Sequence, residues 1–476
     1  MTLEHFAWIR CDLNCYRPET VKTGKIEKCL WIQYDDKRTD MKTMQYKYRG
    51  YSAGMRGRKM TDMSQDQSVS IKKYSRQEKV LRVQNRQAQK THFSDMQDGR
   101  MKQYNTTFCI LSAFTILMVV AGHCGYHIMT VGELFPYYSF HVPLFMFISG
   151  YFYKDSEEEH PIAYIRKKIR RLLVPYFIWN LVYGVVAWVM RAGGFGMGEA
   201  ISLRTLFIEP FMHGYQFIYN YAAWFVPTLF VIEMMNLFMR IVLKWILRHL
   251  RLWEQADGLL EWIVMAGSLL VGIAVVWFAI GGHVWGNYKT PGRILFLFPC
   301  FQMGQFYLKK LEKHDTLGNV PYFAVLFLLQ VVLNVGGNGL AFSSVWCTGF
   351  ANGPVMPYVT IVSGIAFWLR IAKVTEPVFG KSRVVQYLGR NTYAVMMHHV
   401  MAFMLVKMVL ASVAAHTGFC ADFDFAQFYT NIDYFYFVRG AEQFGMVYLA
   451  AGVILPLGLQ AGLNRVKERA AGLIRR

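Results

Sequence analysis

His123 is the clearest candidate for chemistry in this sequence, because it interrupts an otherwise apolar run, FTILMVVAGHCGYH. An ionisable side chain inside an apolar run is costly to bury and is a functional candidate by default. Histidine is the side chain best suited to exchange a proton near neutral pH, and a hydroxyl that attacks a thioester needs such a base. His123 is therefore a candidate general base, although a polar helix end at a membrane interface would also explain it.

A second histidine, His141, lies in the next apolar run, FPYYSFHVPLFMFISGYFYK. If the two runs cross a membrane in opposite directions, both histidines lie near its outer surface. His123 then stands about 24 Å of helix rise from the inner surface. We expect the two histidines to share a pocket, where His141 or Arg390 would stabilise a developing oxyanion.

A basic run, YIRKKIRRLLVPYFIW, precedes the third long apolar segment. It contains more positive charge than membrane topology requires, in Lys167, Lys168, Arg170 and Arg171. Lysine and arginine at such spacing can hold phosphates through charge-assisted hydrogen bonds. A nucleotide-bearing thioester such as coenzyme A would supply those phosphates. The alternative is a basic collar that faces lipid.

Three further ionisable residues lie within apolar runs. Glu233, in WFVPTLFVIEMMNLF, either binds substrate or is a carboxylate satisfied by a neighbouring helix. Arg390 and His398, in LGRNTYAVMMHH, are two helical turns apart and are expected to face one cavity, whereas His399 is expected to point elsewhere.

The segment FCADFDFAQFYTNIDYFYFVRG combines aromatic rings with Asp422 and Asp424. Such a combination suits sugar stacking and hydrogen bonding to hydroxyls, and an interfacial aromatic belt with solvated acids is the alternative. The eight cysteines have no zinc-ligand spacing, so no metal site is predicted.

Apolar runs long enough to span a bilayer must position these residues. Hydrophobic residues make up 54% of the chain and charged residues only 17%, below the roughly 25% of soluble proteins. We therefore predict an all-α membrane protein of about ten transmembrane helices, near residues 107–126, 137–153, 172–190, 223–239, 259–280, 292–308, 321–335, 354–369, 386–406 and 443–464.

The distribution of basic residues predicts that both termini are cytoplasmic. With this orientation the inner segments after residue 105 carry 22 Lys and Arg and the outer segments carry 6, as the positive-inside rule requires. Residues 1–103 are predicted to be a disordered basic tail or a misassigned extension, residues 104–469 the transmembrane domain, and residues 470–476 a basic cytoplasmic tail. The basic N-terminal tail has no aromatic platform for nucleic acid, so no nucleic-acid partner is expected. The basic segments of the chain are expected to face anionic lipid.

The stretch from about Tyr104 to Asn464 resembles the acyltransferase-3 family of membrane O-acyltransferases, and most closely the branch described as fucose 4-O-acetylase-like. Four motifs carry the resemblance: VVAGH, SFHVPLFMFISGYF, RKKIRRLLVPYF and LGRNTYAVMMHH. The second motif is fairly specific when it is joined to the third.

The resemblance implies ten or so spans in a bacterial cytoplasmic membrane. It also implies an acyl-CoA donor on the cytoplasmic side, with acetyl-CoA expected, a glycan acceptor and no tightly bound cofactor. His123 falls on the family's essential first-span histidine, and His398 on the histidine of the late motif. The family's basic pair corresponds to Lys167 and Lys168 with Arg170 and Arg171.

Two alternatives remain open. Many family members carry Arg or Lys eleven residues before the first histidine, where this chain has Ser112. Either Lys102 or a residue of another span takes that role, or this branch dispenses with it, or activity is lost.

The second alternative concerns the function of the whole protein, which would be a transporter or flippase of a glycan or glycolipid. Such a protein would not consume a thioester. The lack of an inverted repeat in the sequence disfavours this alternative.

Overall fold

The computed structural model describes residues 105–124, 131, 133–214, 217–250, 258–337, 339–419, 422–436 and 442–474, and the structural statements below concern these residues. The predicted N-terminal tail, residues 1–103, lies outside them, as do the last two residues of the predicted C-terminal tail. The described chain is helical and contains no β-strand apart from two isolated bridges, which confirms the all-α prediction for this part of the chain.

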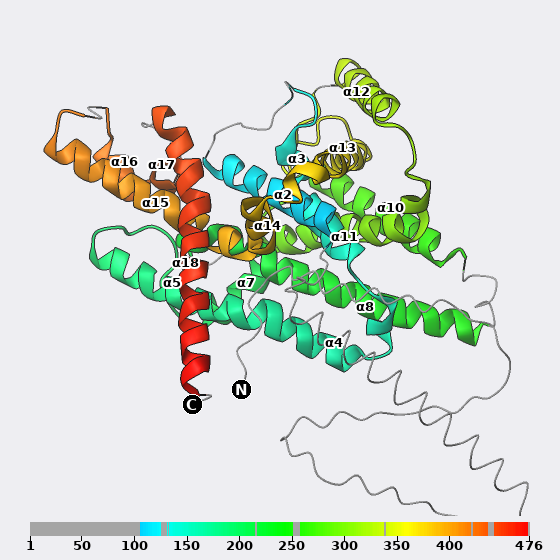
Figure 1. Ribbon diagram of the computed structural model, residues 1–476, viewed down its shortest axis with the longest axis horizontal. Helices are drawn as coiled ribbons and strands as arrows, with labels where there is room; N and C mark the ends of the chain where they lie inside the picture. Colours follow the sequence, from blue (N-terminus) through cyan, green and yellow to red (C-terminus); the bar gives the residue numbers. More distant parts are fainter. Residues whose placement is uncertain are drawn as a thin grey trace, which may run out of the picture. The chain divides into compact units, whose positions relative to one another are not determined.

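Seven helical stretches of the described chain are long and apolar enough to cross a membrane (Figure 1). The chain is therefore an integral membrane protein. These stretches are α2 (Thr106–Cys124), α4 (Pro161–Lys168) joined to α5 (Val174–Ala192), a 3-10 segment (Ile218–Trp224) joined to α8 (Phe225–His249), α10 (Leu260–Ile280), α13 (Met356–Phe379), α15 (Thr392–His416) and α18 (Gly445–Ile474).

The remaining three predicted apolar segments also fall on helices, namely α3 (Tyr137–Tyr151), α11 (Lys289–Phe306) and α12 (Asn319–Val335). The count of ten spans and the cytoplasmic position of both termini stay predictions. Short helices complete the described chain: α6 (Leu203–Phe207), α7 (Glu209–Met212), α14 (Arg383–Arg390), α16 (Phe425–Thr430) and α17 (Ile432–Tyr436).

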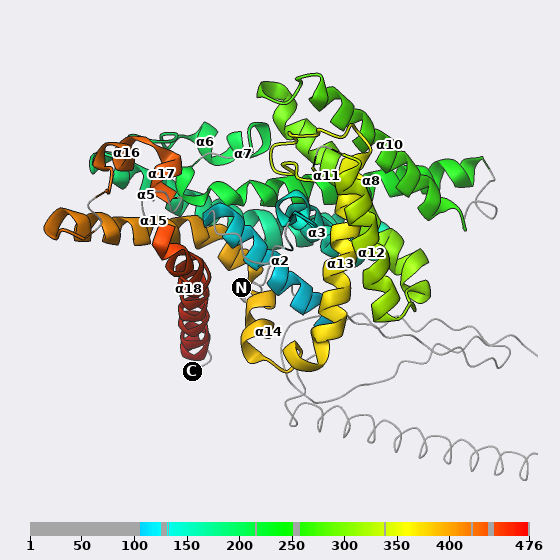
Figure 2. The ribbon, with the colours of Figure 1, turned by 90° about the horizontal axis from the view of Figure 1, so that it is seen from above.

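The most enclosed spans are α2 and α15, each with 72% of its apolar window buried, compared with 28% for α10 and α18. Figure 2 shows α2 among the other helices, with α10 and α18 at the edge. The helix that carries His123 and the helix that carries His398 and His399 therefore both lie in the core.

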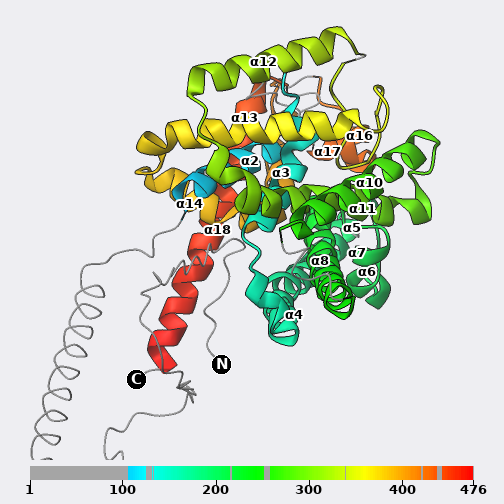
Figure 3. The ribbon, with the colours of Figure 1, turned by 90° about the vertical axis from the view of Figure 1, so that its right-hand side faces the viewer.

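The helix α12 is peripheral and lies beside α13 (Figures 2 and 3). Gln330 is its one buried residue. The side chain of Gln330 accepts a hydrogen bond from the backbone N–H of Phe135 at 3.0 Å and donates one to Ser363 at 2.6 Å. This amide therefore fixes α12 to the loop before α3 and to α13.

Helices α3 and α11 cross with their backbones in close contact, because glycine lies at the crossing on both sides. A Cβ atom at Gly150 would lie 1.8 Å from the carbonyl oxygen of Phe301, and one at Gly304 would lie 2.0 Å from that of Phe147. Small residues allow membrane helices to approach in this way. This crossing positions His141, which α3 carries.

Replacing Gly304 with alanine is expected to destabilise the protein by about 1–3 kcal/mol or more, because the added methyl group must push α3 and α11 apart. The measurement is the thermal unfolding midpoint of the detergent-solubilised full chain. Gly292→Ala is the matched control, since it lies in the same helix and a Cβ there meets nothing within 4 Å. An unchanged midpoint for Gly304→Ala would contradict the close helix contact.

Candidate active site

Three histidines from three helices lie together in the core: His123 of α2, His141 of α3 and His399 of α15. The rings of His123 and His399 meet edge to face, with centroids 4.9 Å apart. His123 and His141 line one cavity of about 20 Å³, as the sequence predicted. The other residues that line this cavity are Val119, Val142, Phe145, Ala222, Trp224, Phe225, Val345 and Met396.

Hydrogen bonds to helix carbonyls fix the tautomer of each ring in this group, which we call the histidine cluster. Nδ1 lies 2.8 Å from the Val119 oxygen in His123, 3.0 Å from the Tyr137 oxygen in His141, and 2.8 Å from the Val395 oxygen in His399. A carbonyl oxygen only accepts, so each Nδ1 carries the hydrogen. Nε2 of a neutral ring is then a proton acceptor, and Nε2 of His399 is buried without a hydrogen-bond partner.

The histidine cavity is small in this conformation. Its volume of about 20 Å³ is enough for about one water molecule. An acyl group and an acceptor would enter only after side chains in its wall move, and Phe145, Trp224 and Phe225 form the aromatic part of that wall.

His398 faces away from the histidine cluster. Its Nδ1 lies 2.8 Å from the hydroxyl of Tyr183, and its ring centroid lies 4.2 Å from that of Trp179, both on α5. Adjacent residues of an α-helix point about 100° apart, so His398 and His399 cannot both face α2. His399 points elsewhere than His398, as expected, but it points toward His123, and sequence analysis did not single it out as a site residue.

Arg390 also lies away from the histidine cluster, and the expectation that it faces one cavity with His398 stays a prediction. It ends α14, where its Nη2 donates to the side chain of Gln386 at 3.1 Å and its guanidinium contacts the thiol of Cys109. Cys109 precedes His123 by fourteen residues on α2, which is about 21 Å of helix rise. Arg390 therefore reaches α2 one turn before the buried Ser112, whereas Lys102 lies outside the described residues.

The basic run lies on α4 and on the π-helical turn (Ile169–Leu173) that follows it. Such turns occur frequently at functional sites. Lys167 pairs with Glu157 at 2.5 Å, and Lys168 pairs with Glu233 of α8. Arg170 is exposed and Arg171 is half-buried. The run therefore presents two arginines next to two lysines that are held by carboxylates.

Glu233 belongs with the basic run rather than with the predicted sugar-binding acids. It is 2% exposed, and its partner is Lys168. Of the two interpretations from sequence, the geometry favours a carboxylate satisfied by a neighbouring helix. Glu233 follows Phe225, which lines the histidine cavity, by eight residues on α8, or about 12 Å of helix rise.

A buried polar network continues from Glu233 along α8 and was missed in the sequence. Asn236 accepts hydrogen bonds from Gln302 and Gln305 of α11 at 2.9 and 3.1 Å. Arg240 donates two bonds to Glu261 of α10, at 2.9 and 2.6 Å. The spacing of residues 233, 236 and 240 was the available signal, because it puts polar side chains on one face of an apolar helix.

Asp422 and Asp424 do not line the histidine cavity. Asp422 is exposed, and Asp424 caps α16 by accepting from the backbone N–H of Gln427 at 3.0 Å. Their proposed contact with acceptor hydroxyls stays a prediction. Among the described residues, no group of three or more His, Cys, Asp and Glu is placed to hold a metal ion.

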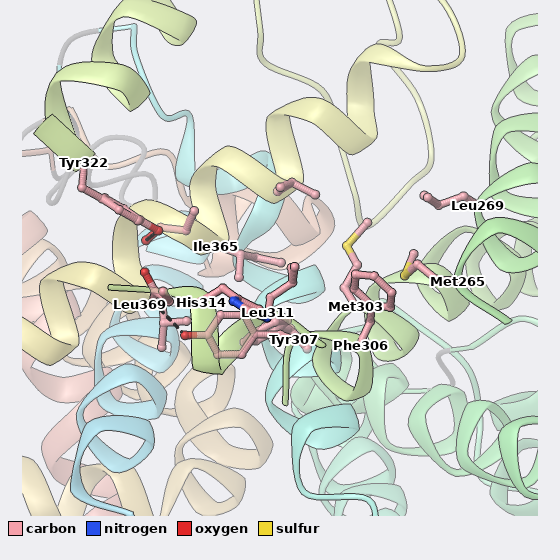
Figure 4. A pocket seen from close by; sticks show the side chains of 14 residues that line it. Met265, Leu269, Met303, Phe306, Tyr307, Leu311, His314, Tyr322, Ile365 and Leu369 are labelled. Carbon is pink, nitrogen blue, oxygen red and sulfur yellow. Dashed lines mark hydrogen bonds between the residues drawn. The ribbon is translucent and has the colours of Figure 1, made fainter. Parts of the chain in front are cut away.

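A larger pocket of about 450 Å³ lies between α10, α11, α12 and α13. Figure 4 shows Tyr307, His314 and Tyr322 toward one end of it and Met265, Leu269 and Met303 toward the other. The hydroxyl of Tyr307 donates to Asp315 at 2.9 Å, and Lys373 binds the same carboxylate at 2.6 Å. Its lining is mostly apolar and includes no predicted site residue, so the histidine cavity is the better candidate despite its smaller volume.

Comparison with known families gives one match. A family model described as an acyltransferase domain matches residues 110–438. No curated protein and no solved structure matches the chain. The matched range contains the histidine cluster, the basic run and every other predicted site residue.

Proposed function

The chain belongs to the acyltransferase-3 family of membrane acyltransferases, and from this we propose that it moves an acetyl group from cytoplasmic acetyl-CoA to a hydroxyl of a cell-surface or exported glycan. The observation that carries the proposal is the histidine cavity, which stands about 12 Å along α8 from the basic run. We further propose that the protein belongs to the fucose 4-O-acetylase-like branch and acts in a bacterial cytoplasmic membrane.

The donor binds at the basic run in this mechanism. The phosphates of acetyl-CoA contact Arg170 and Arg171. The two neighbouring lysines, Lys167 and Lys168, are paired with carboxylates and add positive charge to the same run. The pantetheine arm extends between helices toward the histidine cavity. Arg390, which reaches α2 beside Cys109, supplies the positive charge that many family members carry at the position of Ser112.

The acceptor hydroxyl reaches the cavity from the opposite side. Nε2 of His123 takes the hydroxyl proton as the oxygen attacks the thioester carbonyl. The C–S bond then breaks, and the CoA thiolate leaves and takes up a proton. We propose that His399, whose ring meets that of His123 edge to face with centroids 4.9 Å apart, receives this proton from His123 and returns it to the thiolate. A route through acyl-His123 would use the same nitrogen as nucleophile.

The tautomers limit what His141 does in this mechanism. Its Nδ1–H is already donated to the Tyr137 carbonyl, so the neutral ring has no hydrogen for an oxyanion. His141 stabilises the oxyanion only when its ring is protonated at both nitrogens. Arg390 is about 21 Å of helix rise from His123 along α2, so we assign it to the donor and not to the oxyanion.

The test is transfer of labelled acetyl from acetyl-CoA to surface glycan in membranes that contain the full chain. Label on the glycan, with release of CoA in equal amount, supports an acyltransferase with this donor and acceptor. A flippase would move the glycan and leave acetyl-CoA intact. Glycan translocation without any loss of acetyl-CoA would therefore replace this proposal by the flippase alternative.

Replacing Arg170 and Arg171 together with glutamine is expected to raise the KM for acetyl-CoA by about 10²- to 10⁴-fold, since two charged hydrogen bonds are lost and each is worth about 1.5–3 kcal/mol. The kcat should change little, because neither arginine touches the reacting atoms. Arg383→Gln is the control, as an exposed arginine at the start of α14 away from the run. An unchanged KM for acetyl-CoA in the double variant would contradict the assignment of the donor phosphates to this basic run.

A further inference from the structure

The wall of the histidine cavity is supported from behind by a buried arginine. Trp224 and Val345 line the cavity. The guanidinium of Arg293 lies 3.9 Å from the ring centroid of Trp224, and its Nε donates to the Val345 oxygen at 2.8 Å. Arg293 is 2% exposed. A full positive charge is therefore fixed one side chain away from the cavity.

A second cation lies one turn earlier on α11. The ammonium of Lys289 is 4.5 Å from the ring centroid of Trp346, and the guanidinium of Arg293 is 5.8 Å from the same ring. Burial, and after it the charge of Arg293, lowers the pKa of Lys289 to about 8. The two cations thus share one tryptophan and repel each other.

Aromatic rings connect this pair to the surface. The ring centroid of Trp346 lies 5.6 Å from that of Trp285 and 6.1 Å from that of Tyr221. Trp285 is 58% exposed, whereas Arg293 is almost fully buried. The exposed Trp285 therefore contacts Trp346, which lies against Lys289 and Arg293. Arg293 in turn contacts Trp224 in the wall of the histidine cavity.

The chain segments that build this cluster contain no carboxylate. Residues 210–232, 262–311 and 316–375 include Tyr221, Trp224, Lys289, Arg293 and Trp346 but no Asp or Glu at all. The acids expected to bind acceptor lie elsewhere, because Asp424 caps α16 and Asp422 is exposed. The side chains named in this cluster are therefore aromatic or positively charged.

We propose that the acceptor is an anionic sugar, with Trp346 and Trp285 stacking on its ring, Lys289 binding its carboxylate or phosphate group, and the buried charge of Arg293 adding to the attraction. Lysine and arginine bind both anions through charge-assisted hydrogen bonds, and an aromatic face covers the apolar face of a pyranose. This inference rests on the proposed function, and it names the class of acceptor that the histidine cluster acylates.

The experiment uses membranes with the full chain, labelled acetyl-CoA and the host's surface glycan, separated beforehand into acidic and neutral fractions by anion exchange. Label in the acidic fraction is expected. Converting carboxylates to hydroxymethyl groups before the assay should abolish labelling if the anion is a carboxylate, and dephosphorylation should do so if it is a phosphate. Label confined to the neutral fraction would overturn the inference and leave the proposed function standing. The absence of label from both fractions would contradict the inference and the proposed function alike.

The variant Lys289→Gln tests the subsite itself. We expect a rise of about 10- to 100-fold in the KM for the acidic fraction, from loss of a charged hydrogen bond, with the KM for acetyl-CoA unchanged. Arg204→Gln is the control for loss of positive charge, since Arg204 is exposed on α6 and pairs with Glu209. An unchanged KM for the acidic fraction in Lys289→Gln would exclude this cluster as the anion site.

Discussion

His123→Ala is expected to lower acyl transfer by about 10²- to 10⁴-fold, the usual contribution of a general acid–base group. The Nδ1–H of His123 is held by the Val119 carbonyl, so Nε2 is the nitrogen available for the proton of an attacking hydroxyl. Alanine removes that acceptor and enlarges a cavity that already exists. The measurement is the initial rate of label transfer from acetyl-CoA, corrected for the amount of protein inserted in the membrane.

His416→Ala is the matched control for this substitution. His416 makes the same type of bond, from Nδ1 to the carbonyl four residues earlier at 2.8 Å, but it is exposed at the end of α15. Its replacement should leave the rate unchanged. Normal transfer by a well-inserted His123→Ala protein would contradict the assignment of His123 as the general base. His141, which lines the same cavity, would then be the candidate base.

Apolar length and charge were enough to find the helices. Nine of the ten apolar runs fall on one helix each, and the run 386–406 crosses from α14 to α15. Burying a backbone among apolar side chains requires internal hydrogen bonds whatever the detailed packing. The expectation that His123 and His141 share a pocket is confirmed, because both line one cavity. Their depth in the membrane stays a prediction.

The sequence alone could not predict which face of α15 packs against α2. Apolar side chains surround this helix on all sides, so no amphipathic pattern indicates which of two adjacent histidines faces α2. The spacing argument for Arg390 met a different obstacle. Helical spacing from 390 to 398 assumes one helix, but Asn391 has non-helical dihedrals and separates α14 from α15. Only packing between distant segments decides both positions.

The two adjacent histidines of α15 are expected to give opposite results when each is replaced by alanine. His399→Ala should lower kcat by about 10- to 100-fold with an unchanged KM for acetyl-CoA, a smaller loss than for His123 because His399 acts through that ring. His398→Ala should keep kcat. It should instead destabilise the protein by about 1–3 kcal/mol, since the buried hydroxyl of Tyr183 loses its partner.

Measuring rate and thermal unfolding for both variants separates a role in the reaction from a role in packing. Both histidines lie on the same turn of one helix, and the two rates are compared per amount of protein inserted in the membrane. A lower kcat in His399→Ala with a lower unfolding midpoint in His398→Ala would establish that α15 presents His399 to the reaction. The reverse pattern would mean that the reaction uses the side of α15 that faces α5, where Trp179 and Tyr183 enclose His398.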